Sequence, residues 1–320
     1  MPSSKLHRPG ELRLTLPATS ANLGPAFDAA ALAFSLFLDI HAKPAEKFSI
    51  SARGRDSEIC SQLEDHLILT TYRQVLLNEN KPVTPLAISL QNEIPIGKGC
   101  GSSAAARLAG IAFANHFGRL RWTETRIVGE AACREHHPDN AAACWIGGLA
   151  IARMSAERET QMIRIAPKGK WPLLLAVPDE PLPTEEARRV LPDQYARADV
   201  VANIQNSMLL IAALAQGRRD LLSAALADRV HQPYRSRLCP LLPALQPLTG
   251  SKGILGVALS GAGPSVLIFL DPQENTRVAK KRLAEYLKIR NLRAELIETG
   301  IANHGAGSRA PLATRRVPGP

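Results

Sequence analysis

The stretch PIGKGCGSSAAA, which begins at Pro95, carries closely spaced glycines followed directly by two serines. Glycines allow backbone N–H groups to approach an anion because no Cβ stands in the way. Ser102 and Ser103 then open a helical pattern, and a helix N-terminus adds unpaired donors and the positive end of a dipole. Serine hydroxyls at this point could also reach a phosphate or its Mg²⁺. The stretch suggests a phosphate-binding loop, although a plain loop before a capped helix accounts for it as well.

A second glycine turn, SGAGPSV, begins at Ser260. The strand-like SVLIFL follows it where a dinucleotide-binding fingerprint requires a helix, so that interpretation fails. Gly261 and Gly263 predict a hairpin turn that could close over a phosphate or a substrate. The chain also lacks G-x-x-x-x-G-K-[ST], H-R-D and D-F-G. A P-loop and a protein kinase site are therefore excluded.

Hydrophobic periodicity around these loops predicts two halves of different architecture. The first half is expected to contain strands at residues 11–17, 47–53 and 85–94. Its helices are expected at residues 65–78, 104–118 and 124–135. The second half starts somewhere in 150–172. It is expected to contain strands at residues 171–178, 253–260, 265–270 and 292–298, and helices at residues 200–215, 220–230 and 274–290. That order suits an α+β split ferredoxin-like sandwich rather than a doubly wound sheet.

Composition narrows the class of protein only modestly. The net charge of +10, with most of the excess in the second half, would suit nucleic acid or an anionic substrate, but aromatic residues are only 4%. Five cysteines without a C-x-x-C pair argue against zinc and for reduced thiols in a cytoplasm. No secretory signal is visible, and the segment between Asp28 and Asp39 is too short to span a bilayer, with no longer apolar run elsewhere.

Six segments, in register along the chain, resemble the homoserine kinase subgroup of the GHMP kinase superfamily. They are PATSANLGPAFDAA from Pro17, PIGKGCGSSAA from Pro95, HHPDNAAACWIGG from His136, VPDEPLPTEEARRVLP from Val177, DRVHQPYR from Asp228 and SGAGPSV from Ser260. The likeness runs from about Arg13 to about Glu298. Ala26 stands where the family commonly has Gly, and Lys98 and Cys100 stand where Ser and Leu are usual. Inside a loop of backbone donors, Cys100 is expected to have a lowered thiol pKa.

The resemblance implies a two-lobed GHMP kinase-like α+β fold. Its N-terminal half (1–160) would be ribosomal-S5-like and would hold the ATP phosphate loop, and its C-terminal half (161–304) would be the split β-α-β sandwich. The Gly/Pro-rich end (305–320) is expected to be a disordered tail.

The implied activity is phosphorylation of the L-homoserine side-chain hydroxyl, giving O-phospho-L-homoserine for threonine biosynthesis, with ATP and Mg²⁺. A mevalonate-, sugar- or shikimate-like kinase is the alternative within the superfamily, and a basic nucleic-acid-binding protein on this fold is a distant one. No nucleic acid or membrane partner is expected, and the resemblance allows a homodimer.

The resemblance also carries roles for individual residues. The nucleotide would be bound by Pro95, Ile96, Gly97, Lys98, Gly99, Cys100, Gly101, Ser102, Ser103, Ala104, Ala105, Gly261 and Gly263. Ser103 with Glu130 would hold Mg²⁺, and Glu135 is a competing candidate because its spacing to HPDN varies among relatives. Asn22 and Asp28 would receive the substrate's amino group, and Arg188 and Arg235 would bind its carboxylate through paired N–H donors. His137, Asp139 and Asn140 would lie beside the attacking hydroxyl, with Asn140 orienting it.

Overall fold

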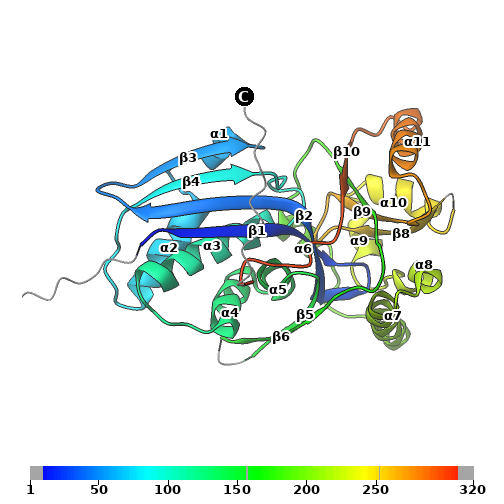
Figure 1. The fold of residues 1–320 in the computed structure, drawn as a ribbon. Helices are drawn as coiled ribbons and strands as arrows, with labels where there is room; N and C mark the ends of the chain where they lie inside the picture. The colour runs from blue at the N-terminus through cyan, green and yellow to red at the C-terminus, as the bar shows by residue number, and fades with distance from the viewer. Residues whose placement is uncertain (1–9, 156–157, 252, 309–320) are drawn as a thin grey trace, which may run out of the picture.

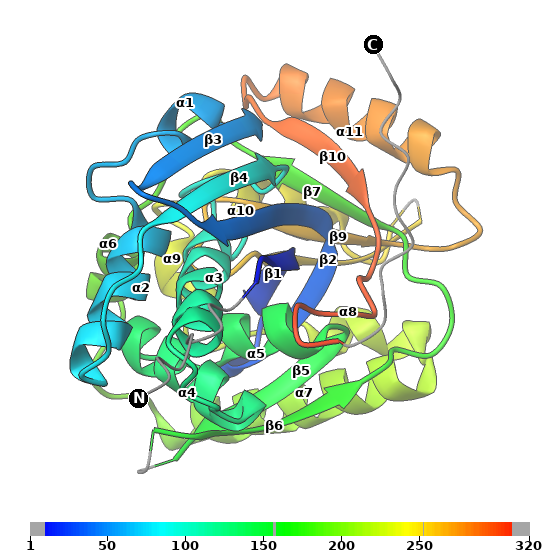
Figure 2. The same ribbon diagram turned by 60° about the vertical axis from the view of Figure 1, so that its left-hand side comes forward.

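The computed structural model describes residues 10–155, 158–251 and 253–308, and it divides into two lobes (Figure 1). The first lobe is a six-stranded sheet, β3-β4-β2-β5-β6, with β1 paired to β2 off this path. Its elements are β1 Leu12–Asn22, β2 Ala26–Pro44, β3 Ser49–Gly54, α1 Ser57–Cys60, α2 Leu67–Asn78, β4 Leu86–Asn92, α3 Ser102–Phe117, α4 Glu124–Glu135, α5 Asp139–Ile146, β5 Leu149–Met154 and β6 Thr160–Ile165. Helices α2, α3, α4 and α5 lie along one side of the sheet (Figures 1 and 2).

The second lobe is built on an antiparallel sheet, β10-β7-β9-β8. Its elements are β7 Leu173–Val177, α6 Thr184–Arg189, α7 Arg197–Gln216, α8 Leu222–Ala225, α9 Gln232–Arg235, α10 Leu241–Leu245, β8 Ile254–Leu259, β9 Val266–Leu270, α11 Thr276–Ile289 and β10 Glu295–Thr299, with 3₁₀ turns at Arg219–Leu221 and Gln246–Leu248. Every residue of β7 and β9 is buried. Such short continuous apolar strands are typical of a sheet covered on both faces.

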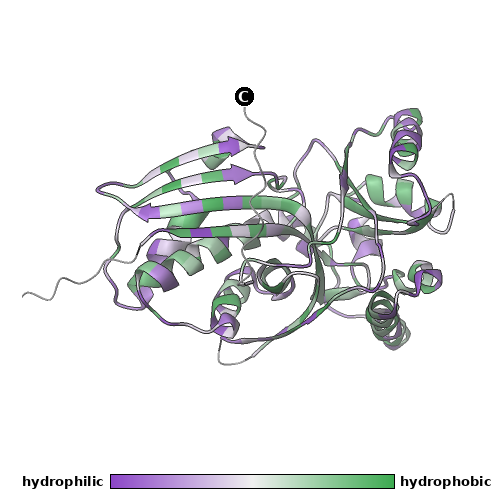
Figure 3. Ribbon diagram, in the orientation of Figure 1, coloured by the Kyte–Doolittle hydropathy of each residue, from purple (hydrophilic) through white to green (hydrophobic). Residues whose placement is uncertain are grey.

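Apolar side chains form one large core that lies under the first sheet and continues into the second lobe, where it includes Leu175 and Phe269, and a smaller core within the second lobe. The ribbon coloured by hydropathy shows apolar and polar residues alternating along strands of the first lobe's sheet (Figure 3). On β4 the alternation in LAISLQN places Leu86, Ile88 and Leu90 in the core. Period-2 burial of this kind fixes the register, because a slip of one residue would expose that set.

The long strand β2 links the parts of the first lobe. Its later half pairs with β4 and its earlier half with β5. The segment after β10 also returns to this lobe: Ala302 N–H donates to Ala33 O, and Gly148 N–H donates to Ala302 O. Because β6 pairs along its length with β5, we propose that the lobes divide between Ile165 and Leu173 rather than at residue 160.

Three predictions from the sequence are corrected by these elements. The helix expected at 220–230 is only a 3₁₀ turn followed by one turn of α8. The prediction of a disordered tail over 305–320 is wrong for its first residues, because Ala306 and Gly307 donate backbone hydrogen bonds to the carbonyl oxygens of Cys144 and Trp145. The residues from 309 on lie outside the described part of the chain. Finally, the prediction that no longer apolar run exists elsewhere in the chain does not hold for α7. This helix is apolar enough, by length and composition alone, to cross a membrane.

Candidate functional site

The glycine loop between β4 and α3 has the backbone conformation that its sequence suggests. Gly97, Gly99 and Gly101 all have positive φ, at 69°, 75° and 73°. Gly101 is the N-cap of α3 and offers no capping side chain, so the first N–H groups of this helix face outward without a side-chain acceptor from the cap. A loop of this kind followed by an open helix N-terminus is an anion-binding arrangement.

The loop packs directly against the second glycine turn. A Cβ on Gly99 would collide with the carbonyl oxygens of Ser260 and Gly263, and the Ser260 hydroxyl donates to Gly99 O at 2.8 Å. From the first motif, the Asn22 amide donates to Gly261 O at 2.9 Å. Three segments far apart in the sequence therefore meet at one place.

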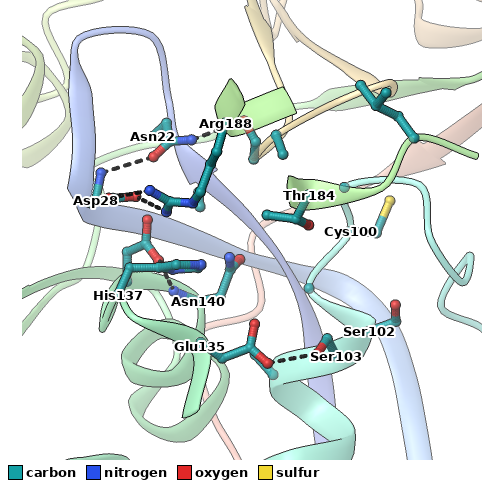
Figure 4. Close-up of a pocket in the computed structure, with 18 of the residues that line it drawn as sticks. Asn22, Asp28, Cys100, Ser102, Ser103, Glu135, His137, Asn140, Thr184 and Arg188 are labelled. Carbon is teal, nitrogen blue, oxygen red and sulfur yellow. Dashed lines mark hydrogen bonds and ion pairs between the residues drawn. The ribbon is translucent and has the colours of Figure 1, made fainter. Parts of the chain in front are cut away.

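A cavity of about 100 Å³ lies where they meet (Figure 4). It is lined by most of the residues predicted from the sequence: Asn22, Asp28, Gly97, Gly99, Cys100, Gly101, Ser102, Ser103, Ala104, His137, Asp139, Asn140, Arg188, Arg235 and Gly261. The residues that do not line it are Pro95, Ile96, Lys98, Ala105, Glu130 and Gly263. The wall also includes residues that were not predicted: Ala21, Leu182, Thr184 and Ala262. Of these, Thr184 opens the T-x-x-A-R segment and could have been found from it.

Arg188 and Asp28 form a two-pronged ion pair across the cavity. Arg188 NH1 and NH2 donate to the two oxygens of Asp28 at 3.1 and 2.8 Å. Asp28 is held in turn by its own backbone N–H, which donates to Asn22 Oδ1 at 3.0 Å. Both ends of the Asn22 amide are thus engaged with the protein, so Asn22 positions Asp28.

Arg235 is the largest fully buried side chain and is 1% exposed. Its Nε–H donates to Ala187 O at 2.9 Å, and its NH1 faces His231 Nδ1 at 3.2 Å. Both arginines approach the ring of Phe27, with the guanidinium carbons of Arg188 and Arg235 at 5.5 and 5.3 Å from its centroid. Burial lowers the pKa of Arg235 to about 10, and the nearby charge of Arg188 acts in the same direction. Two cations thus contact the same aromatic ring and repel each other, and an anion between them would relieve this repulsion.

His137, Asp139 and Asn140 form the opposite side of the cavity at the start of α5. His137 Nδ1 lies 2.6 Å from Asp139 Oδ1, and Asn140 Oδ1 accepts a hydrogen bond from the Thr19 hydroxyl at 2.7 Å. Burial lowers the pKa of His137, but the hydrogen bond and the charge of Asp139 outweigh it, and the net pKa is raised. The other Asp139 oxygen is buried and has no hydrogen-bond partner among the described residues. With Asp28 nearby, this side of the cavity is acidic.

Of the residues considered for Mg²⁺ from the sequence, Ser103 contacts Glu135 and not Glu130. The Ser103 hydroxyl donates to Glu135 Oε1 at 2.6 Å, and Arg107 Nε lies 2.5 Å from the same oxygen. Glu130 lies outside the cavity wall and pairs with Arg134 at 2.9 Å. Of the two glutamates, Glu135 is therefore the one that faces Ser103.

Two loop residues do not behave as expected. Cys100 is fully buried, with Sγ near Lys98 O and Ser265 Oγ, and burial raises its pKa to about 12 instead of lowering it. Lys98 turns its ammonium group to the Asp179 carbonyl. Leu182 N–H also donates to Gly97 O at 3.2 Å, so the segment between β7 and α6 lies over the glycine loop.

A second, more apolar cavity of about 500 Å³ adjoins the first. Gly97, Ser102 and Ser103 line both cavities. The remaining wall comes from the segment around α1, the start of α2 and the end of β4, and it includes Ile59, Gln62, Ile68, Leu90, Asn92 and Ile94. The glycine loop therefore stands between a polar and an apolar compartment.

Comparison with known proteins gives a consistent result. The GHMP kinases N terminal domain pattern matches residues 66–148, and the GHMP kinases C terminal pattern matches residues 210–289. The chain is 44% identical to a homoserine kinase of Solibacter usitatus over 81% of this chain and 84% of that protein. It is 37% identical to a homoserine kinase of Deinococcus radiodurans, again over 81% and 84%. Among solved structures, the homoserine kinase of Cytophaga hutchinsonii superimposes with a TM-score of 0.77 at 23% identity, covering 95% of this chain and 98% of that one.

Proposed function

The chain belongs to the homoserine kinase family of the GHMP kinases, and from that premise we propose how its residues transfer the γ-phosphoryl group of ATP to the side-chain hydroxyl of L-homoserine. The product is O-phospho-L-homoserine, and the enzyme is an ATP-dependent phosphotransferase. The observation that carries the residue assignment is the single cavity in which the glycine loop, two arginines and three carboxylates (Asp28, Glu135 and Asp139) meet. Phosphoryl transfer depends mainly on positioning and on charge neutralisation, and this cavity offers groups for both.

The nucleotide is assigned to the two adjoining compartments. The backbone donors of Gly97–Ser103 and the open N-terminus of α3 would bind the phosphates. The apolar cavity of about 500 Å³ would take the adenine ring, because a flat heterocycle is favoured by apolar walls with a few polar groups such as Asn92 and Gln62. Gly261 closes the phosphate side from the second lobe, whereas Gly263 packs against Cys239 and supports the turn.

Mg²⁺ is assigned to Glu135 and Ser103. A carboxylate and a hydroxyl are the oxygen donors that Mg²⁺ prefers, and the two side chains already touch at the start of α3. When bound, the ion would neutralise charge on the phosphates. Glu130 is not proposed again as a ligand, since its carboxylate is engaged by Arg134.

The substrate is assigned as a zwitterion between the two charged sides of the cavity. Arg188 and Arg235 would bind its carboxylate, and Asp28, held by Asn22, would receive its ammonium group. Asn140 would orient the hydroxyl. His137 donates from Nδ1 to Asp139, which leaves Nε2 as the nitrogen that can take up a proton.

We also propose a cytoplasmic location, which the five free cysteines of the described chain support.

A coupled ADP-release assay with L-homoserine, followed by mass spectrometry of the product, tests the function. We expect one added phosphoryl group and a requirement for Mg²⁺. Faster turnover of mevalonate, galactose or shikimate than of homoserine would overturn the proposal.

A further inference from the structure

Arg107 is a charged residue near the nucleotide compartment that the mechanism above does not use. It lies one helical turn after Ser103 on α3, and its side chain is 25% exposed. Its Nε approaches Glu135 Oε1 at 2.5 Å, and that same oxygen accepts the Ser103 hydroxyl. Arg107 therefore holds the carboxylate that we assign to Mg²⁺.

A guanidinium stays charged at any physiological pH, so this contact is permanent unless another cation displaces it. A divalent ion that arrived alone at Glu135 would face the charge of Arg107 a few Å away, in a partly buried site where screening is weak. A nucleoside triphosphate brings several negative charges to the same place. It would offset the added cation and would give Arg107 a new anionic partner.

We propose that Arg107 is a tethered counter-ion of Glu135, which weakens binding of a bare divalent cation and so couples metal entry to the arrival of the nucleotide. This inference rests on the proposed function, because it needs Glu135 as a metal ligand. Arg107 acts through Glu135 and is a positioning residue. By linkage, the same coupling strengthens nucleotide binding when the metal is present.

The neighbouring pair on α4 shows what a purely structural pair looks like. Arg134 and Glu130 are four residues apart on one helix, at 2.9 Å, with side chains 15% and 7% exposed, and neither lines the cavity. Arg107 and Glu135 instead join α3 to α4, and Glu135 lines the cavity. Arg134 is thus a matched control for Arg107.

The test measures Mn²⁺ binding to the full-length, nucleotide-free protein by electron paramagnetic resonance of the free ion. Arg107→Met, which keeps the length and removes the charge, should bind Mn²⁺ alone about tenfold more tightly than the wild type, or better, since one charge at contact distance is removed. Arg107→Lys should resemble the wild type because it restores the charge. Arg134→Met should also resemble the wild type. A non-hydrolysable ATP analogue should then strengthen Mn²⁺ binding less in Arg107→Met than in the wild type.

Unchanged or absent Mn²⁺ binding by Arg107→Met, in protein whose circular dichroism matches the wild type, would overturn the inference. Failure of the proposed metal site looks different. In that case Glu135→Gln would leave Mn²⁺ binding in the presence of the nucleotide analogue unaltered, whatever residue stands at position 107. If Glu135→Gln abolishes the gain produced by Arg107→Met, the effect passes through that carboxylate.

Discussion

Arg188 and Asp28, 160 residues apart in the sequence, are joined by two hydrogen bonds in the wall of one cavity. The sequence assigns the two residues to opposite ends of the same substrate, the carboxylate and the ammonium group. In this pair, Asp28 gives Arg188 the carboxylate that the proposed substrate would supply, and Arg188 gives Asp28 the cation that the ammonium group would supply. A zwitterion can replace both halves of the pair, whereas a simple anion would leave Asp28 without a partner. This relationship favours an amino acid over mevalonate or a sugar as the acceptor.

Replacement of Arg188 by Ala should lower kcat/KM for homoserine while the KM for ATP stays nearly constant. A hydrogen bond to a charged group contributes about 1.5–3 kcal/mol, which corresponds to a loss of roughly 10- to 150-fold. Steady-state kinetics with each substrate varied in turn measure the effect. Arg189→Ala is the control, because that side chain is 77% exposed and forms an ion pair with the exposed Glu185, at 3.7 Å. A rise in the KM for ATP alone would assign Arg188 to the phosphates.

Replacement of Glu135 by Gln should raise the Mg²⁺ concentration needed for half-maximal rate and lower the maximal rate. Glu130→Gln should leave the Mg²⁺ dependence unchanged but destabilise the fold, since it leaves the half-buried Arg134 without its carboxylate. Rate measurements over a Mg²⁺ series and thermal unfolding of both variants make the comparison. The opposite outcome, with Glu130→Gln shifting the Mg²⁺ dependence, would restore the assignment made from the sequence.

The difference between Glu130 and Glu135 shows where sequence reasoning stops. The two residues are five apart on α4, so they point about 140° away from each other. Helical spacing therefore establishes that only one of them can face Ser103. Which one does depends on how α4 is rotated against α3, and the sequence carries no local signal for that rotation.

Local backbone chemistry was far easier to predict. The glycine loop was found because Gly97, Gly99 and Gly101 need a conformation that other residues avoid. Strands β7 and β9 were found because they are continuous apolar runs. Strands β5 and β6 were missed because polar and apolar residues do not alternate regularly along them. The burial of Cys100 was missed too, since Ser265, from the other lobe, covers its thiol.

Cys100 should resist alkylation in the folded protein. Its pKa, raised by burial to about 12, keeps the thiol protonated at neutral pH, and its side chain has no exposed surface. Brief treatment with iodoacetamide, followed by peptide mass mapping, should label the half-buried Cys60 and Cys133 first. Labelling of Cys100 should require unfolding. Rapid modification that ATP prevents would show that the thiol is open to the nucleotide compartment.

The pairing of His137 with Asp139 should give stability and activity opposite pH dependences. Because the net pKa of His137 is raised above its ordinary 6.5, the pair stabilises the fold fully below that value and loses this contribution as the pH rises through the raised pKa. Turnover should increase over the same range, since only the neutral ring can accept a proton at Nε2. Unfolding free energies of the wild type and His137→Gln, measured at several pH values, should converge toward alkaline pH. A wild-type advantage that grows with pH would contradict the assigned pair.

His231 should act on homoserine binding through Arg235, which it contacts inside the second lobe. His231 Nε2 lies 2.8 Å from Gly24 O, so Nε2 carries the proton and Nδ1 is the acceptor that faces Arg235 NH1. Burial lowers the pKa of His231 to about 4, and the ring is therefore neutral at neutral pH and adds no charge beside the arginine. His231→Gln keeps a donor near the Nε2 position and loses the acceptor, whereas His231→Asn keeps an acceptor near Nδ1.

The KM for homoserine should consequently rise roughly tenfold in His231→Gln and less in His231→Asn, with the KM for ATP little changed in both. Since both substitutions disturb a fully buried ring, their melting temperatures should fall by similar amounts. The difference in KM between the two variants is then the quantity that reports on Arg235, because loss of packing alone would affect both alike. Equal KM values at equal stability would show that His231 only fills space, and that Arg235 is held by Ala187 O and Gly261 O without it.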